Sequence, residues 1–198
     1  MNRLVYGGIG ILLLAVGIGP IHLVEIQEKA TLSHSVAISK VSAQVTKPLQ
    51  PAEPKRLIIP VLNVNAPIQS MGLDEGKMAV PNNFSDIGWY KYGTIPGNKG
   101  SAVMGAHVDN GGSVRGVFKY LKDVAPGDDI YVTDTEGTTR HFRVSDRKVY
   151  PYQTKITDEV FLQNDKVRLN LITCHGKFLP KENTYNQRLV VFAELVTS

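Results

Sequence analysis

Short apolar segments separated by turn residues run through the chain after residue 55. In these segments hydrophobic side chains recur at every second position or form a short continuous run, which is typical of β-strands. The expected strands are Arg56–Ile59, Ala66–Ser70, Ser101–His107, Asp129–Thr133, Thr138–Val144, Lys166–Cys174 and Arg188–Val196. Short helical turns are expected at Asn83–Ile87, Val117–Lys122 and Thr157–Gln163. The pattern predicts an all-β domain with short helices, built as a sandwich or a barrel.

A different pattern occupies the beginning of the chain. Leu4–Val24 is a run of 21 residues without Asp, Glu, Lys or Arg, and at about 1.5 Å per residue it would span a hydrocarbon core of about 30 Å. Arg3 precedes the run and Glu25 follows it, so the positive-inside rule places the N-terminus in the cytoplasm and the rest of the chain outside. A cleaved signal peptide is the alternative, although no small-x-small site closes the run.

The chain therefore divides into three predicted parts: a transmembrane signal anchor at 1–24, an extracellular stalk at 25–55 and a catalytic domain at 56–198. The stalk is mostly small and polar, and its end carries Pro48, Pro51 and Pro54 at every third position, which favours an extended spacer. The remaining length is enough for one hydrophobic core. We expect a single-pass protein of the cell membrane with its domain on the extracellular face.

The amino-acid composition excludes several classes of protein and of functional site. The 198 residues are 42% apolar, which excludes a wholly disordered chain, and the net charge of +4 is far from that of a nucleic-acid-binding protein, so no nucleic-acid partner is expected. A single cysteine excludes an intrachain disulfide framework and a zinc site built on paired cysteines. The role of this one thiol becomes the central question.

The alternation of Lys166–Cys174 places Cys174 away from the core. Val167, Leu169, Leu171 and Thr173 share the core face, and Cys174 falls on the opposite, more polar face at the end of the strand. A cysteine that only fills space normally lies among the core residues, so its position favours Cys174 as a nucleophile. The alternative is a structural thiol, buried because a second layer of the protein covers this face of the strand.

A nucleophilic thiol requires a base or a cation nearby. His107 closes an apolar run just before a Gly-rich loop, whereas His175 would point to the opposite face from its neighbour Cys174. If the last strand pairs with Lys166–Cys174, Arg188 would stand near Cys174 and could lower the thiol pKa or donate to an oxyanion. A structural histidine and an ordinary surface arginine are the competing interpretations.

The combination of these residues resembles the sortases, the membrane-anchored cysteine transpeptidases of mainly Gram-positive bacteria. Leu171-Ile172-Thr173-Cys174 is similar to the end of the family's T-L-x-T-C motif, Ala106-His107 to its histidine motif, and Arg188–Ala193 to its final strand. The segment Gly88–Val103 most resembles the class F group, with class D or E second. The sequence departs from the family pattern in having Asn170 where Thr is usual and in the order Gly105-Ala106-His107.

The resemblance implies an eight-stranded β-barrel and assigns roles to the candidates. Cys174 would attack the Thr–Gly carbonyl of an LPxTG-like sorting signal, Arg188 and the backbone N–H after Cys174 would hold the oxyanion, and His107 would act as general acid and base. The partners would be secreted proteins with that signal and an amine acceptor, either a peptidoglycan precursor or a pilin lysine. No cofactor is expected.

The long loop predicted at 145–165 corresponds to the region that helps form the sorting-signal groove in sortases. Ile156, Val160 and Phe161 are its candidate substrate contacts, although these side chains could merely cover the barrel. No tight cluster of carboxylates suggests a required metal. Two other functions remain open: a catalytically inactive, membrane-tethered β-barrel binding module, and an L,D-transpeptidase-like cysteine enzyme, whose Ser-x-Gly-Cys run is absent here.

Overall fold

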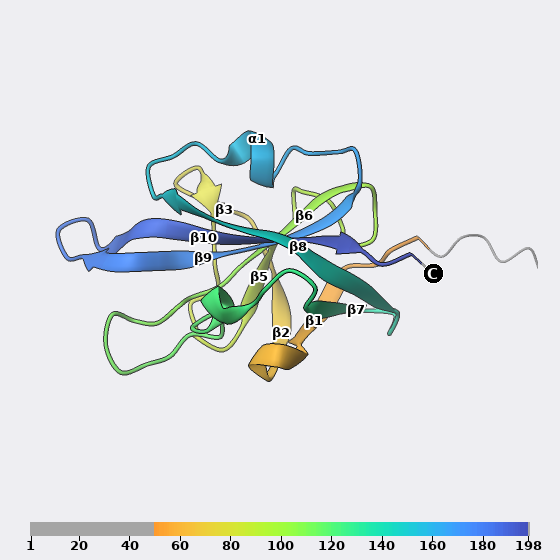
Figure 1. The fold of residues 1–198 in the computed structure, drawn as a ribbon, viewed down its shortest axis with the longest axis horizontal. Coiled ribbons are helices and arrows are strands. Elements are labelled where there is room, and N and C mark those ends of the chain that lie inside the picture. Colours follow the sequence, from red (N-terminus) through yellow and green to blue (C-terminus); the bar gives the residue numbers. More distant parts are fainter. Residues whose placement is uncertain (1–49, 198) are drawn as a thin grey trace, which may run out of the picture. The chain divides into compact units, whose positions relative to one another are not determined.

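The computed structural model describes residues 50–197, which form a closed eight-stranded barrel (Figure 1). The strands follow one another around it in the order β1-β2-β5-β6-β9-β10-β8-β7. The elements are β1 (Pro54–Ile59), η1 (Pro60–Leu62), β2 (Val64–Met71), β3 (Leu73–Asp74), β4 (Lys77–Met78), β5 (Ile87–Tyr90), β6 (Gly100–Gly105), η2 (Leu121–Asp123), β7 (Asp129–Asp134), β8 (Thr139–Pro151), α1 (Thr157–Val160), β9 (Val167–Leu179) and β10 (Thr184–Leu195). The prediction of an eight-stranded barrel is confirmed.

The predicted membrane anchor and nearly all of the predicted stalk lie outside the described residues. Within 50–197, the structure contains no helix whose length and apolar character would suit a membrane span. The boundaries of the anchor, the stalk and the domain therefore stay predictions.

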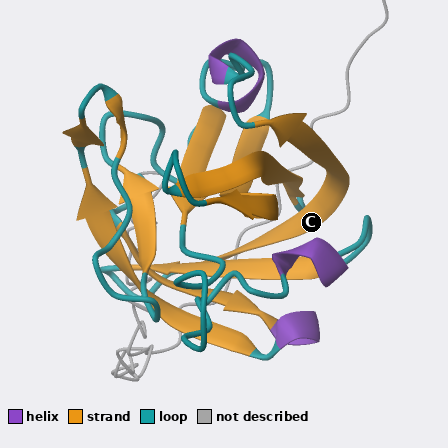
Figure 2. Ribbon diagram, turned by 90° about the vertical axis from the view of Figure 1, so that its left-hand side faces the viewer, coloured by secondary structure: helices purple, strands orange, loops and turns teal. Residues whose placement is uncertain are grey.

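Two of the strand pairs in the barrel are parallel, β2 with β5 and β6 with β9, and the other pairs are antiparallel. The helical pieces lie outside the barrel wall (Figure 2). Parallel neighbours require a long connection between them, and the one from β6 to β9 contains β7, β8 and α1. This arrangement brings together the ends of two strands that are far apart in the sequence.

Strict alternation along β9 and β10 divides the apolar residues between two clusters. Leu169, Leu171, Leu189 and Val191 point into the barrel core, as the sequence predicts. Residues of the opposite face form a second cluster outside the barrel, under α1, with Val103, Val160, Val190 and Phe192 buried in it. This second cluster covers part of the outer face of the sheet, and Cys174, further along β9, lies outside the cluster and is half-buried.

The structure corrects several expected elements. The helical turn predicted at Asn83–Ile87 is wrong: that stretch consists of bends, and Ile87–Tyr90 is strand β5, buried on both faces. Strand β8 continues to Pro151 instead of ending at Val144, which shortens the predicted 145–165 loop. Strand β9 continues past Cys174 to Leu179, and β10 begins at Thr184, before Arg188. The two strands therefore form a longer hairpin than the predicted strands, which left the residues between Cys174 and Arg188 unpaired.

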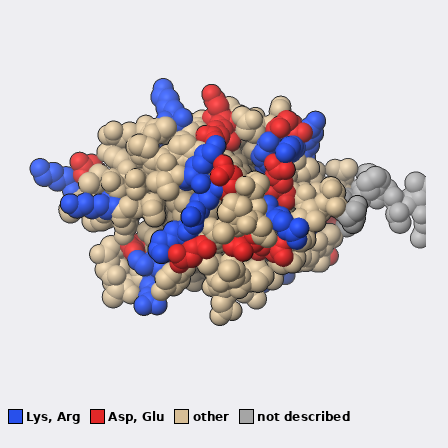
Figure 3. Space-filling model, viewed as in Figure 1, with Lys and Arg blue, Asp and Glu red and all other residues tan. Residues whose placement is uncertain are grey.

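Charged side chains of both signs are interspersed over the face of the barrel that Figure 3 shows. Some charged side chains form ion pairs. Lys166, just before β9, pairs with Glu194 of β10 over 2.9 Å, and Lys148 of β8 pairs with Glu159 of α1 over 2.7 Å. On this face, the mild net charge is therefore spread over mixed surfaces instead of being gathered into one basic patch.

Candidate active site

The parallel pairing of β6 with β9 brings together His107, which follows the end of β6, and Cys174, which lies within β9. Gly105 of β6 pairs with Ile172 of β9, and both His107 and Cys174 follow two residues later. The Thr173 hydroxyl donates to the Ala106 carbonyl oxygen over 2.8 Å, which fixes the two chains just before the functional side chains. Adjacent strands lie about 4.8 Å apart, so the two side chains emerge next to each other.

Arg188 lies on the other side of Cys174. The two residues are directly paired in the β9–β10 ladder, as the sequence predicts. Its guanidinium donates to the carbonyl oxygens of Tyr185 and Gln187 and to the Thr184 hydroxyl, each over 2.9 Å. No acidic side chain within residues 50–197 forms an ion pair with it. The cation is thus oriented by neutral partners and keeps its charge available to an anion.

A bulge in the β9–β10 hairpin shapes the surroundings of the sulfur. The register shifts between Tyr185 and Gln187, opposite Gly176, which has φ = 81°. Glycine adopts such a left-handed conformation without steric penalty. The Asn186 side chain accepts a hydrogen bond from the Lys177 amide over 2.7 Å and so fixes the bulge. The Tyr185 backbone next to the bulge lowers the pKa of the Cys174 thiol.

The imidazole of His107 is held by the loop between β4 and β5. Its Nε2 atom lies 2.9 Å from the Pro81 carbonyl oxygen, and its ring lies 4.7 Å from that of Phe84. A carbonyl oxygen only accepts hydrogen bonds, so the Nε2 atom carries the proton. The Nδ1 atom is consequently the nitrogen that remains free to take up or release a proton.

A half-buried carboxylate, that of Asp109, connects the His107 loop to the hairpin that carries Arg188. Asp109 accepts a hydrogen bond from the Tyr185 hydroxyl and pairs with Lys119 over 2.5 Å. Burial alone would raise the pKa of Asp109, but these partners and the Gly111 amide hold it below its usual value. Burial and the Asp109 hydrogen bond raise the pKa of Tyr185 to about 12.

Opposing influences act on the Cys174 thiol. Burial raises its pKa above the usual value, and the Asp109 charge acts in the same direction. The Arg188 charge and the Tyr185 backbone hydrogen bond lower it, but they do not outweigh burial. Attack by this sulfur therefore requires a base that removes the thiol proton.

Cys174, His107 and Arg188 line a single cavity of about 600 Å³. One wall belongs to the segment after β8, where Tyr152, Ile156, Phe161 and Leu162 line it. Met78, Val80 and Tyr90 add further apolar lining, and the Tyr90 ring packs edge to face on that of Phe161. A cavity of this size with apolar walls and a few polar groups is typical of a ligand site.

Of the three predicted substrate contacts, Ile156 and Phe161 line this cavity and Val160 does not. Val160 is fully buried in the cluster under α1, so the prediction of direct contact with a substrate is wrong for this residue. One turn of helix turns successive side chains to different sides, and that of Val160 faces the sheet.

No group of three or more His, Cys, Asp and Glu side chains within 50–197 lies close enough together to hold a metal ion. The site's chemistry, as far as the described residues provide it, consists of a thiol, an imidazole and a guanidinium. Such a set is suited to nucleophilic attack on a carbonyl, with a proton donor and an oxyanion partner at hand.

A sequence profile of the sortase domain matches residues 57–196. The chain belongs to the sortase family. Sortases are transpeptidases with a catalytic cysteine, and this sortase has one cysteine. The L,D-transpeptidase-like alternative is thereby set aside. Comparison with curated protein sequences gave no match.

Solved structures of other sortases share the fold. Sortase A from Corynebacterium diphtheriae is 22% identical with a TM-score of 0.57, and the match covers 75% of this chain and 63% of that one. Sortase C1 from Streptococcus agalactiae, in complex with MTSET, is 22% identical with a TM-score of 0.56, covering 73% and 67%. The sortase D5 transpeptidase of Clostridium perfringens is 18% identical with a TM-score of 0.55, covering 73% and 79%. The class F assignment stays a prediction.

Sequence reasoning missed several residues that adjoin this site. Pro81 and Phe84 hold His107, and Asp109 and Tyr185 join the two loops beside Cys174. Asp109 follows His107 by two positions and could have been suspected from that spacing. Nothing local marks Pro81 or Tyr185, because their roles depend on contacts with distant parts of the chain.

The two departures from the family pattern have structural explanations. Gly105 is closely packed: a Cβ atom there would lie 3.3 Å from Val80 and 3.4 Å from Ile172. Glycine at position 105 therefore leaves room for these two side chains. Asn170 is fully buried and donates to the carbonyl oxygen of Val160 over 2.6 Å.

Proposed function

We propose that this sortase is a membrane-anchored transpeptidase that cleaves an LPxTG-like sorting signal between Thr and Gly. It would join the new carboxyl end to an amine of the cell wall or to a pilin lysine. The observation that carries the proposal is the cavity shared by Cys174, His107 and Arg188. The predicted anchor at 4–24 would hold the domain on the extracellular face of the membrane.

In the first half-reaction the Cys174 sulfur attacks the Thr carbonyl carbon, and a carbon–sulfur bond forms as the carbonyl oxygen becomes negatively charged. The Arg188 guanidinium, oriented by three neutral acceptors, stabilises that charge. His107 first takes the thiol proton on Nδ1. It then gives this proton to the departing Gly nitrogen as the amide bond breaks.

In the second half-reaction an amine attacks the thioester. A new carbon–nitrogen bond forms, the carbon–sulfur bond breaks, and the proton lost by the amine returns to Nδ1 of His107. The thioester keeps the acyl group reactive towards amines until an acceptor arrives, which suits transfer. Water reacting in place of the amine gives hydrolysis.

Mass spectrometry of the full-length protein in detergent micelles tests the proposal. After incubation with a Leu-Pro-x-Thr-Gly peptide, we expect an acyl adduct on Cys174, and its conversion to an amide product when an amine such as triglycine is added. The Cys174→Ala variant serves as the control and should give neither species. Absence of any adduct on the unaltered protein across a panel of such peptides would leave the inactive binding module as the better explanation.

A further inference from the structure

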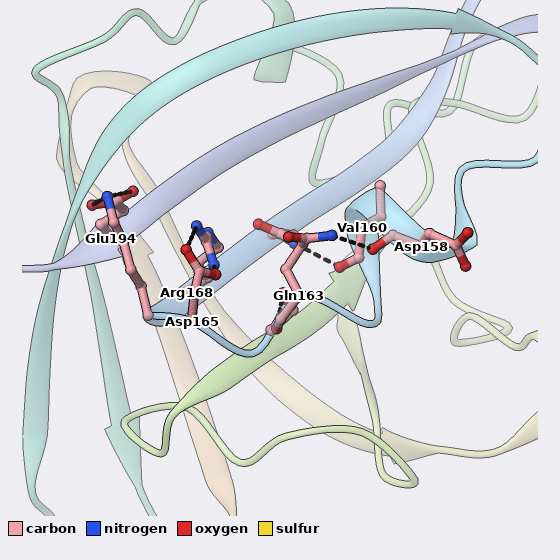
Figure 4. A network of polar contacts seen from close by, with 9 residues as sticks. Asp158, Val160, Gln163, Asp165, Arg168 and Glu194 are labelled. Atoms are coloured by element: carbon pink, nitrogen blue, oxygen red, sulfur yellow. Dashed lines mark hydrogen bonds and ion pairs between the residues drawn. The ribbon is translucent and has the colours of Figure 1, made fainter.

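The segment 152–165, which forms one wall of the cavity, is attached to the barrel by two buried side chains. Asn170 of β9 donates from its side-chain nitrogen to the Val160 carbonyl oxygen over 2.6 Å. Ser101 of β6 donates from its hydroxyl to the Gln163 carbonyl oxygen over 3.1 Å. Asn170 is 0% exposed and Ser101 is 1% exposed. Figure 4 shows Val160 and Gln163 lying over the strands with these polar contacts around them.

This wall segment has little regular structure of its own. Its helix α1 is four residues long, and an isolated turn of helix is not stable in water. Within the segment, the Gln163 side chain donates to the Asp158 carbonyl oxygen over 2.9 Å. Its position therefore depends on what joins it to the barrel: the apolar cluster around Val160, the exposed ion pair of Glu159 with Lys148, and the buried hydrogen bonds from Asn170 and Ser101.

The Asn170 side chain makes an unfavourable contribution to the stability of the fold. Its side-chain oxygen is buried and has no hydrogen-bond partner within the described residues, and an unsatisfied buried acceptor lowers stability. Its paired neighbours on the two adjacent strands, Val103 and Phe192, are both apolar and buried. An aliphatic side chain would be more stable in this environment. We therefore attribute the presence of the amide to its hydrogen bond with the Val160 carbonyl oxygen.

We propose that Asn170, together with Ser101, is a positioning residue for peptide binding. It fixes the wall segment so that Ile156, Phe161 and Leu162 present their side chains to the cavity. Asn170 lies four residues before Cys174 on the same face of β9, a separation of about 13 Å along a strand. One strand thus sets the distance between the apolar wall and the sulfur. This inference rests on the proposed function, because it assumes that a peptide binds along this wall.

The Asn170→Leu variant of the full-length protein, in detergent micelles, tests this role. We expect the KM for the sorting-signal peptide to rise roughly three- to tenfold, the loss of one buried hydrogen bond, with kcat within about twofold. Alkylation of Cys174 by iodoacetamide, which needs no wall, should keep its rate. Backbone amides of 156–165 should exchange with deuterium faster than in the unaltered protein.

A second variant and a matched control guard against a change that merely weakens the fold. Ser101→Ala removes the other attachment and should raise the KM in the same direction. Thr139→Ala removes a hydroxyl hydrogen bond with Thr133 over 2.8 Å in the β7–β8 pair, which contains no residue of the wall segment, and should leave the KM unchanged. An unchanged KM or unchanged exchange in Asn170→Leu overturns the inference. A fall in kcat and alkylation together also overturns it. Absence of turnover by the unaltered protein overturns the proposed function instead.

Discussion

His107 and Cys174 occupy equivalent positions on two parallel strands, each two residues beyond the last paired residues, Gly105 and Ile172. Parallel pairing keeps neighbouring strands in step, so equivalent positions point to the same side of the sheet. The alignment of these two side chains therefore depends on the backbone register of β6 and β9 more than on either loop. Arg188 joins them through the antiparallel pairing of β10 with β9.

The packing of Gly116 against the backbone of His107 gives the first prediction. A Cβ atom at Gly116 would lie 2.1 Å from the His107 carbonyl oxygen and 2.5 Å from its carbonyl carbon. Backbone atoms cannot move aside as a side chain can, so Gly116→Ala must displace His107. We expect peptide turnover to fall by about a hundredfold, the cost of a misplacement of about 1 Å. Gly112→Ala, in the same loop, meets only the Asn110 side chain at 3.4 Å and should retain turnover.

Removing the charge of Arg188 should slow the reactions of the thiol. The guanidinium lowers the pKa of Cys174, so Arg188→Ala raises that pKa further, and the alkylation rate should reach its plateau at higher pH. Peptide turnover should fall by about 10²–10³-fold, as for the loss of an oxyanion donor. Arg188→Lys should restore part of the alkylation profile but little of the turnover, because an ammonium lacks the planar fork. An unchanged pH profile for Arg188→Ala would contradict this assignment.

Neutralising Asp109 should have the opposite effect on the same measurement. Its negative charge raises the pKa of the Cys174 thiol, and its removal also frees the Lys119 ammonium. For Asp109→Asn we expect the alkylation profile to move to lower pH and the rate at pH 7 to increase. Asp146→Asn, which removes a charge on β8 away from the sulfur, is the control. A shift to higher pH in Asp109→Asn would show that the network acts through geometry and not through charge.

Asp134 should make stability depend on pH in the acidic range. Burial would raise its pKa, but Arg140 and the amides of Glu136 and Thr138 hold it below its usual value. A lowered folded-state pKa means stabilisation that is complete above the unfolded value, near pH 4, and is lost as pH falls through the folded value. Asp134→Asn should cost about 2 kcal/mol at pH 7. Denaturant unfolding at pH 7 and at pH 2.5 should show this difference shrinking in acid.

Sequence alone predicts the strands whose side chains alternate, and also β6, which is a continuous apolar run buried at every position. In β9 and β10 the two faces carry different residue types, so Leu169 and Cys174 were correctly separated and Arg188 was correctly placed beside Cys174. Strand β5 was missed because it has only four residues, Gly88 among them, which is too short for either an alternating pattern or a continuous apolar run to mark it. The extension of β8 beyond Val144 was missed because its polar residues are held by pairing with β10, which no local pattern reveals.

The parts of the site that sequence could not predict depend on distant contacts. The parallel pairing of β6 with β9 joins residues from widely separated segments, and the attachment of His107 to Pro81 comes from a third. Val160 was expected to contact substrate because it is apolar and lies in the right segment. Its burial follows from the turn of α1, which directs it towards the hydrogen-bonded Asn170 beneath.

The parallel pairing of β6 with β9 also governs when the site comes into being during folding. The bond from Thr173 to Ala106 spans 67 residues, and such non-local contacts form only after the entropy cost of closing a long loop has been overcome. A chain that has folded only its local hairpins carries the thiol without its imidazole neighbour. Chemical reactivity of this protein is thus a property of the completed barrel, and an incompletely folded molecule has no organised site with which to attack a peptide.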